Sequence, residues 1–348
     1  MSGNPAGEVR EEDAFDVAAV AAWLAREVGI EGTPEVRQFA GGASNLTYQL
    51  SYPDRELIMR RPPAGVKAKS AHDMGREYRI QSALKPVFGR VPAMVGFCAD
   101  ESVIGSEFYV MERLEGTILR KDLPSDWDLS PDEVSELCRR AVDVLIDLHG
   151  VSVAAAGLGD LGKGEGYVAR QVGGWSRRYR AARTEDVGDG EAVMAWLDAH
   201  QPADVGACLI HNDFRFDNLV LDDEREVIGV LDWEMATVGD PLMDLAGGLA
   251  YWVEAGDDET FQLFRRQPTT APGMWTRTEV VEHYTSRTGL AVSPEQWRFY
   301  EVFGLFRLCV IMQQIYYRYF HGQTHNPDFA ILGEAGRYLE GRCRAVIG

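Results

Sequence analysis

Three polar residues in the second half of the chain have the types and the spacing that phosphoryl transfer uses. Asp213 lies in the run HNDFRFDN, five residues before Asn218, and Asp232 follows fourteen residues later. In a loop of the form H-x-D-x-x-x-x-N, the Asp accepts a proton from an attacking hydroxyl, and the Asn turns back to a magnesium ion. A second Asp on a separate segment holds the same metal. The pattern predicts a catalytic Asp213 and a Mg²⁺ site formed by Asn218 and Asp232.

The elements around these residues must bring them together. The apolar, β-branched run 227–231 is typical of a short strand that ends at Asp232, and Asp222 and Asp223 are typical of a hairpin turn before it. Each motif residue alone has a structural interpretation, because an Asp or Asn beside a turn is often a cap. For His211 we favour such a role, in which it holds the loop through backbone hydrogen bonds. The order and spacing of the other three favour chemistry.

With these residues in place, the chain resembles the aminoglycoside phosphotransferase and choline kinase relatives of protein kinases from about Phe39 to its C-terminus. It looks most like the phosphotransferases related to the kinase-like domain of certain acyl-CoA dehydrogenases. Four segments carry that likeness: GGASNLTY at 41–48, REYR at 76–79, FYVMERLEG at 108–116 and EGYVARQVGGW at 165–175. The chain departs from the family pattern at Asn212, where Gly usually stands between the His and the Asp.

The resemblance implies an α+β, two-lobed protein-kinase-like fold with a small antiparallel-sheet N-lobe and a mainly helical C-lobe. We place the nucleotide-binding lobe at residues 1–113, with a leading helix over 13–29 that Asp13 caps and Gly29 ends. Residues 114–348 form the helical lobe for catalysis and acceptor binding. Its clearest helices are predicted at 134–149, 191–200, 279–289 and 295–319.

The segment after the metal-binding Asp extends the match, because family members carry a GDP-x-x-D sequence there. Gly239, Asp240, Pro241 and Asp244 fill that pattern. Pro241 suits the first turn of a helix, and Asp240 before it suits the N-cap, where exposed amides favour an acidic group. We interpret Asp240 and Asp244 as architectural, with a direct metal role as the less favoured alternative.

The nucleotide phosphates would meet a glycine turn and a cationic side chain. Gly41 and Gly42 lie between two strand-like runs, where backbone amides can approach phosphate oxygens, and Ser44 adds a hydroxyl. The third strand should carry a lysine that grips the α- and β-phosphates, but it offers Arg60. Arginine stays charged and presents a fork suited to phosphate. Lys67 and Lys69, in the loop that follows, are the alternatives.

Two further nucleotide contacts follow from the resemblance. Glu77, on a predicted helix over 73–84, would pair with Arg60 and orient it, whereas the other interpretation is a solvated Glu between Arg76 and Arg79. The strand 107–114 should run into the linker that binds adenine. The backbone C=O of Glu112 and the N–H of Leu114 are the candidate contacts for the adenine edge.

Composition excludes some partner classes. A formal net charge of −19 over 348 residues argues against nucleic-acid binding and against docking on anionic lipid. No apolar run approaches about 18 residues, and the start of the chain is polar rather than signal-like, so we expect a soluble, cytoplasmic protein. The five cysteines are scattered without metal spacing, as expected of reduced thiols.

The resulting functional hypothesis is transfer of the γ-phosphoryl group of ATP, with Mg²⁺, to a hydroxyl of a small molecule; GTP is not excluded as donor. Aromatics at the spacing seen around Trp175 more often pack in a core. The arginines beside them, Arg177, Arg178 and Arg307 among them, suit an anionic acceptor such as a hydroxyacyl-CoA. The alternatives are an aminoglycoside, macrolide or amino-alcohol kinase, and, from another class, a non-catalytic nucleotide-binding pseudokinase. Nothing in the sequence specifies the oligomeric state.

Overall fold

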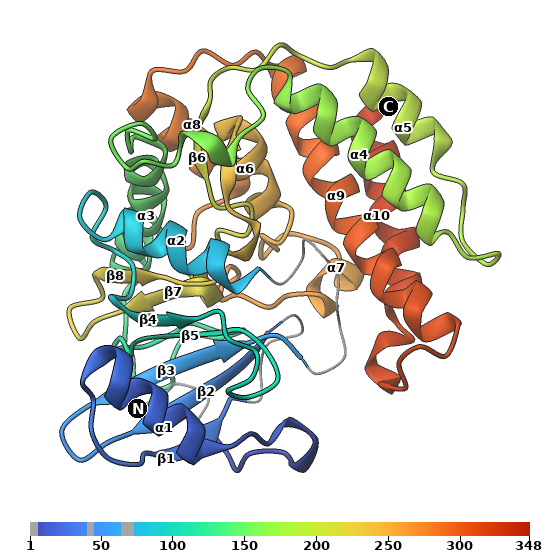
Figure 1. Ribbon diagram of the computed structural model, residues 1–348. Coiled ribbons are helices and arrows are strands. Elements are labelled where there is room, and N and C mark those ends of the chain that lie inside the picture. The colour runs from blue at the N-terminus through green and yellow to red at the C-terminus, as the bar shows by residue number, and fades with distance from the viewer. Residues whose placement is uncertain (1–5, 40–44, 64–72) are drawn as a thin grey trace. The chain divides into compact units, whose positions relative to one another are not determined.

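The structure, a computed structural model, describes residues 6–39, 45–63 and 73–348 (Figure 1). Contacts group the chain into two compact units. The first contains Met1–Ile118, Ala155–Leu158 and Asn218–Met235, and the second contains Leu119–Ala154, Gly159–Asp217 and Ala236–Gly348. The sequence-based division at residue 113 assigned one contiguous segment to each lobe. In the structure, the segment 218–235 that carries Asn218 and Asp232 groups with the first unit.

The first unit is built on a five-stranded antiparallel sheet. Its spatial order is β1-β2-β3-β5-β4, and the strands are β1 (Glu35–Gln38), β2 (Leu46–Ser51), β3 (Glu56–Arg61), β4 (Met94–Cys98) and β5 (Phe108–Glu112). Successive side chains of a strand point to opposite faces. Leu57 and Met59 of β3 therefore join one core cluster, and Ile58 joins another. Arg60 shares the face of Ile58, and Arg61 takes the opposite face, as the alternation predicts.

Each face of this sheet is covered by one helix. Helix α1 (Val17–Val28) packs Val20, Trp23 and Leu24 onto the face of Leu57. Helix α2 (Met74–Leu84) packs on the other face, beside β4 and β5. Its N-cap, Asp73, accepts a hydrogen bond from the Arg76 amide. The helix that carries Glu77 is thus placed on the same side of the sheet as Arg60.

The predicted start of the leading helix at Asp13 is wrong. Helix α1 begins at Val17, and its N-cap is Asp16, whose carboxylate accepts a 3.0 Å hydrogen bond from the Ala19 amide. Asp13 ends a 3₁₀ turn, η1 (Glu11–Asp13), and its carboxylate binds Gln38 and Arg10 instead. An Asp already engaged by these donors is not available to cap a helix. The predicted stop is confirmed, because Gly29 adopts the left-handed conformation at the C-cap.

The predicted hairpin before Asp232 is present in the first unit. Strands β7 (Leu219–Leu221) and β8 (Val227–Val230) pair antiparallel, and the Asp222 carboxylate accepts a hydrogen bond from the Glu226 amide in the turn. The Val230 amide donates to the Arg90 carbonyl at 2.8 Å, and Thr117 bridges to Leu221. A short 3₁₀ turn, η4 (Trp233–Met235), follows Asp232 and buries Trp233 completely. The segment is therefore anchored on both sides of Asp232.

The second unit is mainly helical, as predicted. Its helices are α3 (Pro131–His149), α4 (Tyr167–Ala182), α5 (Glu191–Ala199), α6 (Pro241–Leu249), α7 (Glu259–Leu263), α8 (Arg277–Thr288), α9 (Pro294–Phe320) and α10 (Leu332–Ile347). A two-stranded sheet of β6 (Cys208–Ile210) and β9 (Thr237–Gly239) stands beside them, with the short turns η2 (Gly159–Leu161), η3 (Phe216–Asn218, which crosses into the first unit) and η5 (Pro327–Phe329). Among the described helices, none is long and apolar enough to cross a membrane.

Helices α6 and α9 form the centre of the second unit. Helix α9 buries Phe299, Phe303 and Phe306 along its first half. A Cβ on Gly304 would collide with the backbone carbonyl of Ala246, so the two helices are in direct backbone contact there. Such close packing holds α6 in place, and α6 carries Asp244, which supports the loop of Asp213 described below.

Replacing Leu24 by Ala should destabilise the first unit, because Leu24 is fully buried between α1 and the sheet. Removing a buried leucine side chain costs roughly 2–5 kcal/mol of unfolding free energy. We expect a lower urea midpoint of the transition that reports the first unit. Leu263→Ala is the matched control, since Leu263 is 70% exposed and its loss should leave the midpoint nearly unchanged. Equal shifts for both variants would contradict the assigned core.

Candidate functional site

Arg60 and Glu77 form the ion pair that the sequence predicts. The Nη1 atom of Arg60 lies 3.0 Å from Oε2 of Glu77, and the two side chains are 10% and 1% exposed. Arg60 is positioned by β3 and Glu77 by α2. The alternative of a solvated Glu77 is therefore wrong, because a carboxylate so deeply buried needs a charged partner.

Two neutral side chains complete the environment of Glu77. The Tyr109 hydroxyl donates to Oε2 at 2.8 Å, and the Asn45 amide donates to Oε1 at 3.0 Å. The same Asn45 amide nitrogen lies 3.1 Å from a carboxylate oxygen of Glu234 in η4. Burial raises the pKa of Glu77, and Arg60, Tyr109 and Asn45 offset part of that rise. Glu77 thus receives hydrogen bonds on both oxygens, which restricts its orientation.

Arg60 also binds the proposed metal ligand. Its Nη2 atom donates to Oδ1 of Asp232 at 3.0 Å. Asp232 follows β8, adopts a left-handed backbone conformation with φ 69°, and keeps its side chain 31% exposed. The Nε atom of Arg60 is buried without a hydrogen-bond partner among the described residues. A buried guanidinium N–H with no partner is costly, and an anionic oxygen beside it would remove that cost.

Asn218 and Asp232 bring oxygen ligands into one part of the first unit. The Leu231 amide donates to the Asn218 carbonyl at 2.8 Å, so the backbone just before Asp232 is bonded to Asn218. Amide and carboxylate oxygens suit Mg²⁺, which usually keeps water and phosphate oxygens as its other ligands. Within the described ranges, no group of three or more His, Cys, Asp or Glu residues could hold a metal by itself. The donor set fits a metal that arrives with a nucleotide.

The loop that carries Asp213 belongs to the second unit and starts where β6 ends. His211 is fully buried, and its Nδ1 atom accepts a 3.2 Å hydrogen bond from the Asp213 amide. This contact agrees with the structural role favoured for His211. Asn212 adopts φ 65°, a conformation that glycine takes freely and asparagine tolerates better than other residues. The departure from the family Gly is therefore compatible with the loop geometry.

Asp244 is the main support of this loop. From α6, its carboxylate accepts hydrogen bonds from the amides of His211 at 2.7 Å and Asn212 at 2.6 Å, and it lies 3.0 Å from Nε2 of His149. Burial would raise the pKa of Asp244, but His149 and the loop amides outweigh it, so the pKa lies below its usual value. Asp240 caps α6 at Leu242 and Met243, as predicted.

Arg215 is a residue that the sequence argument missed. Its Nε atom lies 3.2 Å from Oδ1 of Asp213, and its guanidinium stacks over Tyr251 with 4.5 Å between Cζ and the ring centre. This pair orients the Asp213 carboxylate within the second unit. An arginine two residues after the motif Asp carries no distinguishing pattern, so only the loop conformation reveals the contact.

The remaining predicted nucleotide contacts are placed only in part. Gly41, Gly42 and Ser44, and the alternative lysines Lys67 and Lys69, lie outside the described residues. Glu112 is the last residue of β5, and Leu114 follows two residues after it. Leu114 packs its side chain against Gly229 of β8. No described residue accepts a hydrogen bond from the Leu114 amide, so donation from this amide to adenine stays a prediction.

A group of cations and an aromatic ring lies next to the catalytic loop in the second unit. Buried Arg307 of α9 donates to the Asn212 carbonyl at 2.6 Å and lies 5.4 Å from the Trp175 ring of α4. Arg178 stacks on the same ring at 4.5 Å. Burial, Arg177 and Arg307 lower the pKa of Arg178. Like charges gathered around one ring favour an anionic partner.

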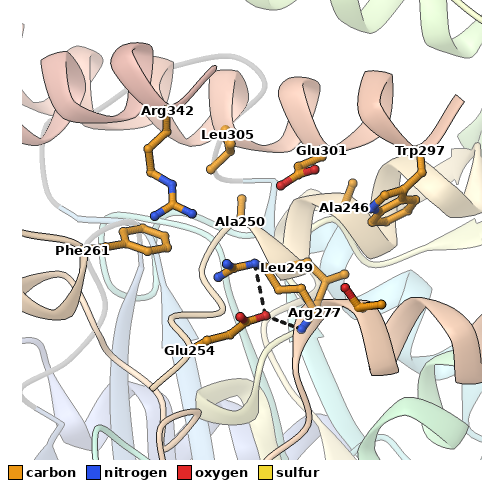
Figure 2. A pocket seen from close by; sticks show the side chains of 11 residues that line it. Ala246, Leu249, Ala250, Glu254, Phe261, Arg277, Trp297, Glu301, Leu305 and Arg342 are labelled. Atoms are coloured by element: carbon orange, nitrogen blue, oxygen red, sulfur yellow. Dashed lines mark hydrogen bonds and ion pairs between the residues drawn. The ribbon is translucent and has the colours of Figure 1, made fainter. Parts of the chain in front are cut away.

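A separate cavity of about 230 Å³ lies among α6, α8, α9 and α10 (Figure 2). Its arginines, Arg277 and Arg342, are both bonded to Asp257. The cavity meets α6 at Ala246, Leu249 and Ala250. At about 100° per residue these positions lie on the opposite side of α6 from Asp244, which faces the catalytic loop. We therefore leave this cavity out of the acceptor site.

Replacing Asp244 by Asn should loosen the catalytic loop. The Asn side chain has one acceptor oxygen and would point an NH₂ group at one of the two loop amides, which leaves a buried donor unpaired. We expect a loss of about 3 kcal/mol of unfolding free energy, measured by denaturant titration. Asp198→Asn, on the exposed end of α5, is the control and should change little. A stable Asp244→Asn protein would contradict the anchoring role.

The same contact predicts a pH dependence. Because the pKa of Asp244 is lower in the folded protein than the usual value of 3.8, its contribution is complete above about pH 4 and is lost as the pH falls through the folded-state pKa. We expect the unfolding free energy of the wild type to fall more steeply below about pH 4 than that of Asp244→Asn, measured by urea titrations between about pH 2.5 and pH 6. Parallel curves would show that the carboxylate is not stabilised by folding.

Comparison with known proteins places these features in a family. Residues 35–280 match the model of the phosphotransferase enzyme family. The chain is 37% identical to mouse (Mus musculus) acyl-CoA dehydrogenase family member 10 over 311 residues, which is 89% of this chain and 28% of that protein. The chain thus spans less than a third of the length of this relative.

Solved structures agree with the predicted fold. A Ralstonia eutropha JMP134 protein, provisionally assigned as an aminoglycoside phosphotransferase, has 31% identity and a TM-score of 0.80, with 96% of this chain and 98% of that chain covered. A thermostable mutant of the aminoglycoside phosphotransferase APH(4)-Ia, in a ternary complex with AMP-PNP and hygromycin B, has 15% identity and a TM-score of 0.58, with 94% of this chain and 97% of that chain covered. The predicted α+β, kinase-like fold is confirmed. With the family model matching residues 35–280, the chain belongs to the phosphotransferase enzyme family.

Proposed function

We propose that this chain is an ATP- and Mg²⁺-dependent phosphotransferase that moves the γ-phosphoryl group of ATP to a hydroxyl of a small molecule. The observation that carries the proposal is the set of contacts around Arg60. One guanidinium joins Glu77 to Asp232 and keeps a buried Nε–H without a partner among the described residues. Such a donor suits a phosphate oxygen. APH(4)-Ia, which shares the fold and was solved with AMP-PNP, supports a nucleotide as the phosphoryl donor.

Different residues bind the nucleotide with its metal and activate the acceptor hydroxyl. In the first unit, Arg60 binds phosphate oxygens, Glu77 orients Arg60, and Asn218 and Asp232 hold the metal. Bound Mg²⁺ would neutralise charge on the phosphate oxygens during transfer. The proposal also assigns phosphate contacts to Gly41, Gly42 and Ser44, and adenine contacts to the backbone of Glu112 and Leu114. These roles follow from the family motif and from the contacts of Arg60.

In the second unit, Asp213 takes the role of catalytic residue. It orients the acceptor hydroxyl and accepts its proton as the oxygen attacks phosphorus. Arg215 holds one side of this carboxylate, and the amide contacts of Asp244 hold the loop backbone. A carboxylate held in this way is prepared for attack before the acceptor binds, which reduces the entropy cost of the reaction.

For the acceptor, we propose an anionic metabolite of the hydroxyacyl-CoA type. The support is the group formed by Trp175, Arg178 and Arg307, because it places cations and an apolar ring beside the catalytic loop. Phosphate groups of coenzyme A suit arginines, and Arg178 is the exposed cation of this group. An aminoglycoside is a cation and would instead require several carboxylates around its hydroxyl.

The proposal is tested by incubating the purified protein with Mg²⁺ and ATP or GTP, together with a panel of hydroxyacyl-CoAs, aminoglycosides, macrolides and amino alcohols. Mass spectrometry then detects a product heavier by one phosphoryl group. We expect a phosphorylated hydroxyacyl-CoA with the wild type and a loss of at least about a thousandfold with Asp213→Ala or Asp232→Asn. The fold of each variant is checked by circular dichroism.

Asp223→Asn is the matched control for Asp232→Asn, because Asp223 is an exposed residue of the β7–β8 turn. It should keep full activity. An Asp232→Asn protein with undiminished turnover would remove Asp232 from the metal site. Nucleotide binding without any product would favour the pseudokinase alternative, and product from an aminoglycoside or macrolide alone would replace the proposed acceptor class.

A further inference from the structure

Tyr109 of β5 places a buried hydroxyl at the centre of the Arg60 contacts. Its side chain is fully buried, and its hydroxyl donates to Oε2 of Glu77 at 2.8 Å and accepts from Nη1 of Arg60 at 3.3 Å. Burial raises the pKa of Tyr109, so the phenol stays neutral and keeps its proton. The hydroxyl therefore bonds to both members of the ion pair at once.

The sheet register determines where this hydroxyl lies. Arg60 of β3 stands directly opposite Tyr109 of β5, so the two side chains leave the sheet as neighbours on the α2 face. Glu77 reaches the same place from α2. A tyrosine has few rotatable bonds, so its hydroxyl is held by the backbone of β5 with little freedom. Arg60, with a long side chain, has no such restriction of its own.

An arginine at this strand position must be held in one orientation, whereas a lysine need not be. The guanidinium is planar, and its two ends do different things here: Nη1 contacts Glu77 and Tyr109, and Nη2 contacts Asp232. The direction of Nε–H depends on the rotation of that plane. A lysine ammonium has one nitrogen with rotating donors, and its orientation needs no such control.

We infer that Tyr109 is a positioning residue, which holds the plane of the Arg60 guanidinium so that its remaining N–H donors face the nucleotide phosphates. The inference rests on the proposed function and adds to that site a residue to which the sequence analysis gave no role. The competing explanation is that Tyr109 only fills the core, since its ring packs with Ile58, Met74 and Met111. Phenylalanine keeps the ring and removes the hydroxyl, so it separates the two explanations.

The test is a double-mutant cycle of Tyr109→Phe and Arg60→Lys, with the affinity for a fluorescent ATP analogue in the presence of Mg²⁺ as the readout. Binding needs no acceptor. We expect Tyr109→Phe to weaken binding about tenfold in the Arg60 protein, because a hydrogen bond to a charged group is lost. In the Arg60→Lys protein the same change should weaken binding by less than about twofold, since no guanidinium plane remains to be held.

Tyr52→Phe is the matched control. Tyr52 follows β2 in the same unit, is 8% exposed, and its buried hydroxyl has no hydrogen-bond partner among the described residues. Its loss should leave nucleotide affinity unchanged. Thermal unfolding of all variants records any general loss of stability, which a positioning role does not require.

The outcomes separate the inference from the proposed function. If the wild type binds the ATP analogue and Tyr109→Phe binds it equally well, Tyr109 is a packing residue only. The same conclusion follows if Tyr109→Phe causes an equal loss in the wild-type and in the Arg60→Lys background. If the wild type binds neither ATP nor GTP, the nucleotide role of the whole site fails, and this inference fails with it. Once an acceptor is known, Tyr109→Phe should raise the KM for ATP and leave kcat nearly unchanged.

Discussion

Burying a guanidinium is the constraint on which the arrangement of the first unit around Arg60 depends. Arg60 carries its charge into the face of the sheet that α2 covers, where it is 8% exposed. Such a charge is tolerated only if acceptors surround it. Glu77 from α2, Tyr109 from β5 and Asp232 after β8 supply them. Three segments that are distant in sequence are therefore held at one point, and the buried Nε–H has no partner among the described residues.

The loop that carries Asp213 also depends on a buried charged group, which here is a carboxylate instead of a guanidinium. A buried carboxylate, Asp244, holds two consecutive backbone amides of the loop, and Nε2 of His149 from α3 lies 3.0 Å from it. Asn212 can then take a left-handed conformation directly before Asp213, and Asp232 is itself left-handed. The backbone at each of these two carboxylates thus includes a conformation that costs free energy locally and is sustained by surrounding hydrogen bonds.

The sequence predicted the parts of this arrangement that depend on local pattern. Strand alternation separated Arg60 from Arg61, hairpin chemistry placed the turn at Asp222, and the Pro241 signal placed the start of α6. Local pattern failed where two equivalent groups compete. Asp13 and Asp16 both suit a helix cap by residue type, and the contact of Asp13 with Gln38, 25 residues away, decides between them.

In the site, the Glu77 pairing was predictable because the motif names both partners, whereas sheet register and loop conformation create the contacts of Tyr109 and Arg215. Roles assigned to the motif residues stay proposals that the contacts of Arg60 and Asp213 support.

The course of the chain through the two units has a consequence for how this protein can be divided. Each unit consists of three separate stretches, and the chain passes from one unit to the other after residues 118, 154, 158, 217 and 235. One of these passages falls between Asp213 and Asn218. No single cut separates the two units cleanly, because a cut after residue 118 leaves β7 and β8 of the first unit on the fragment that carries the second unit. A fragment that is to contain the complete first unit must therefore run through at least residue 235, although most of that unit lies before residue 119.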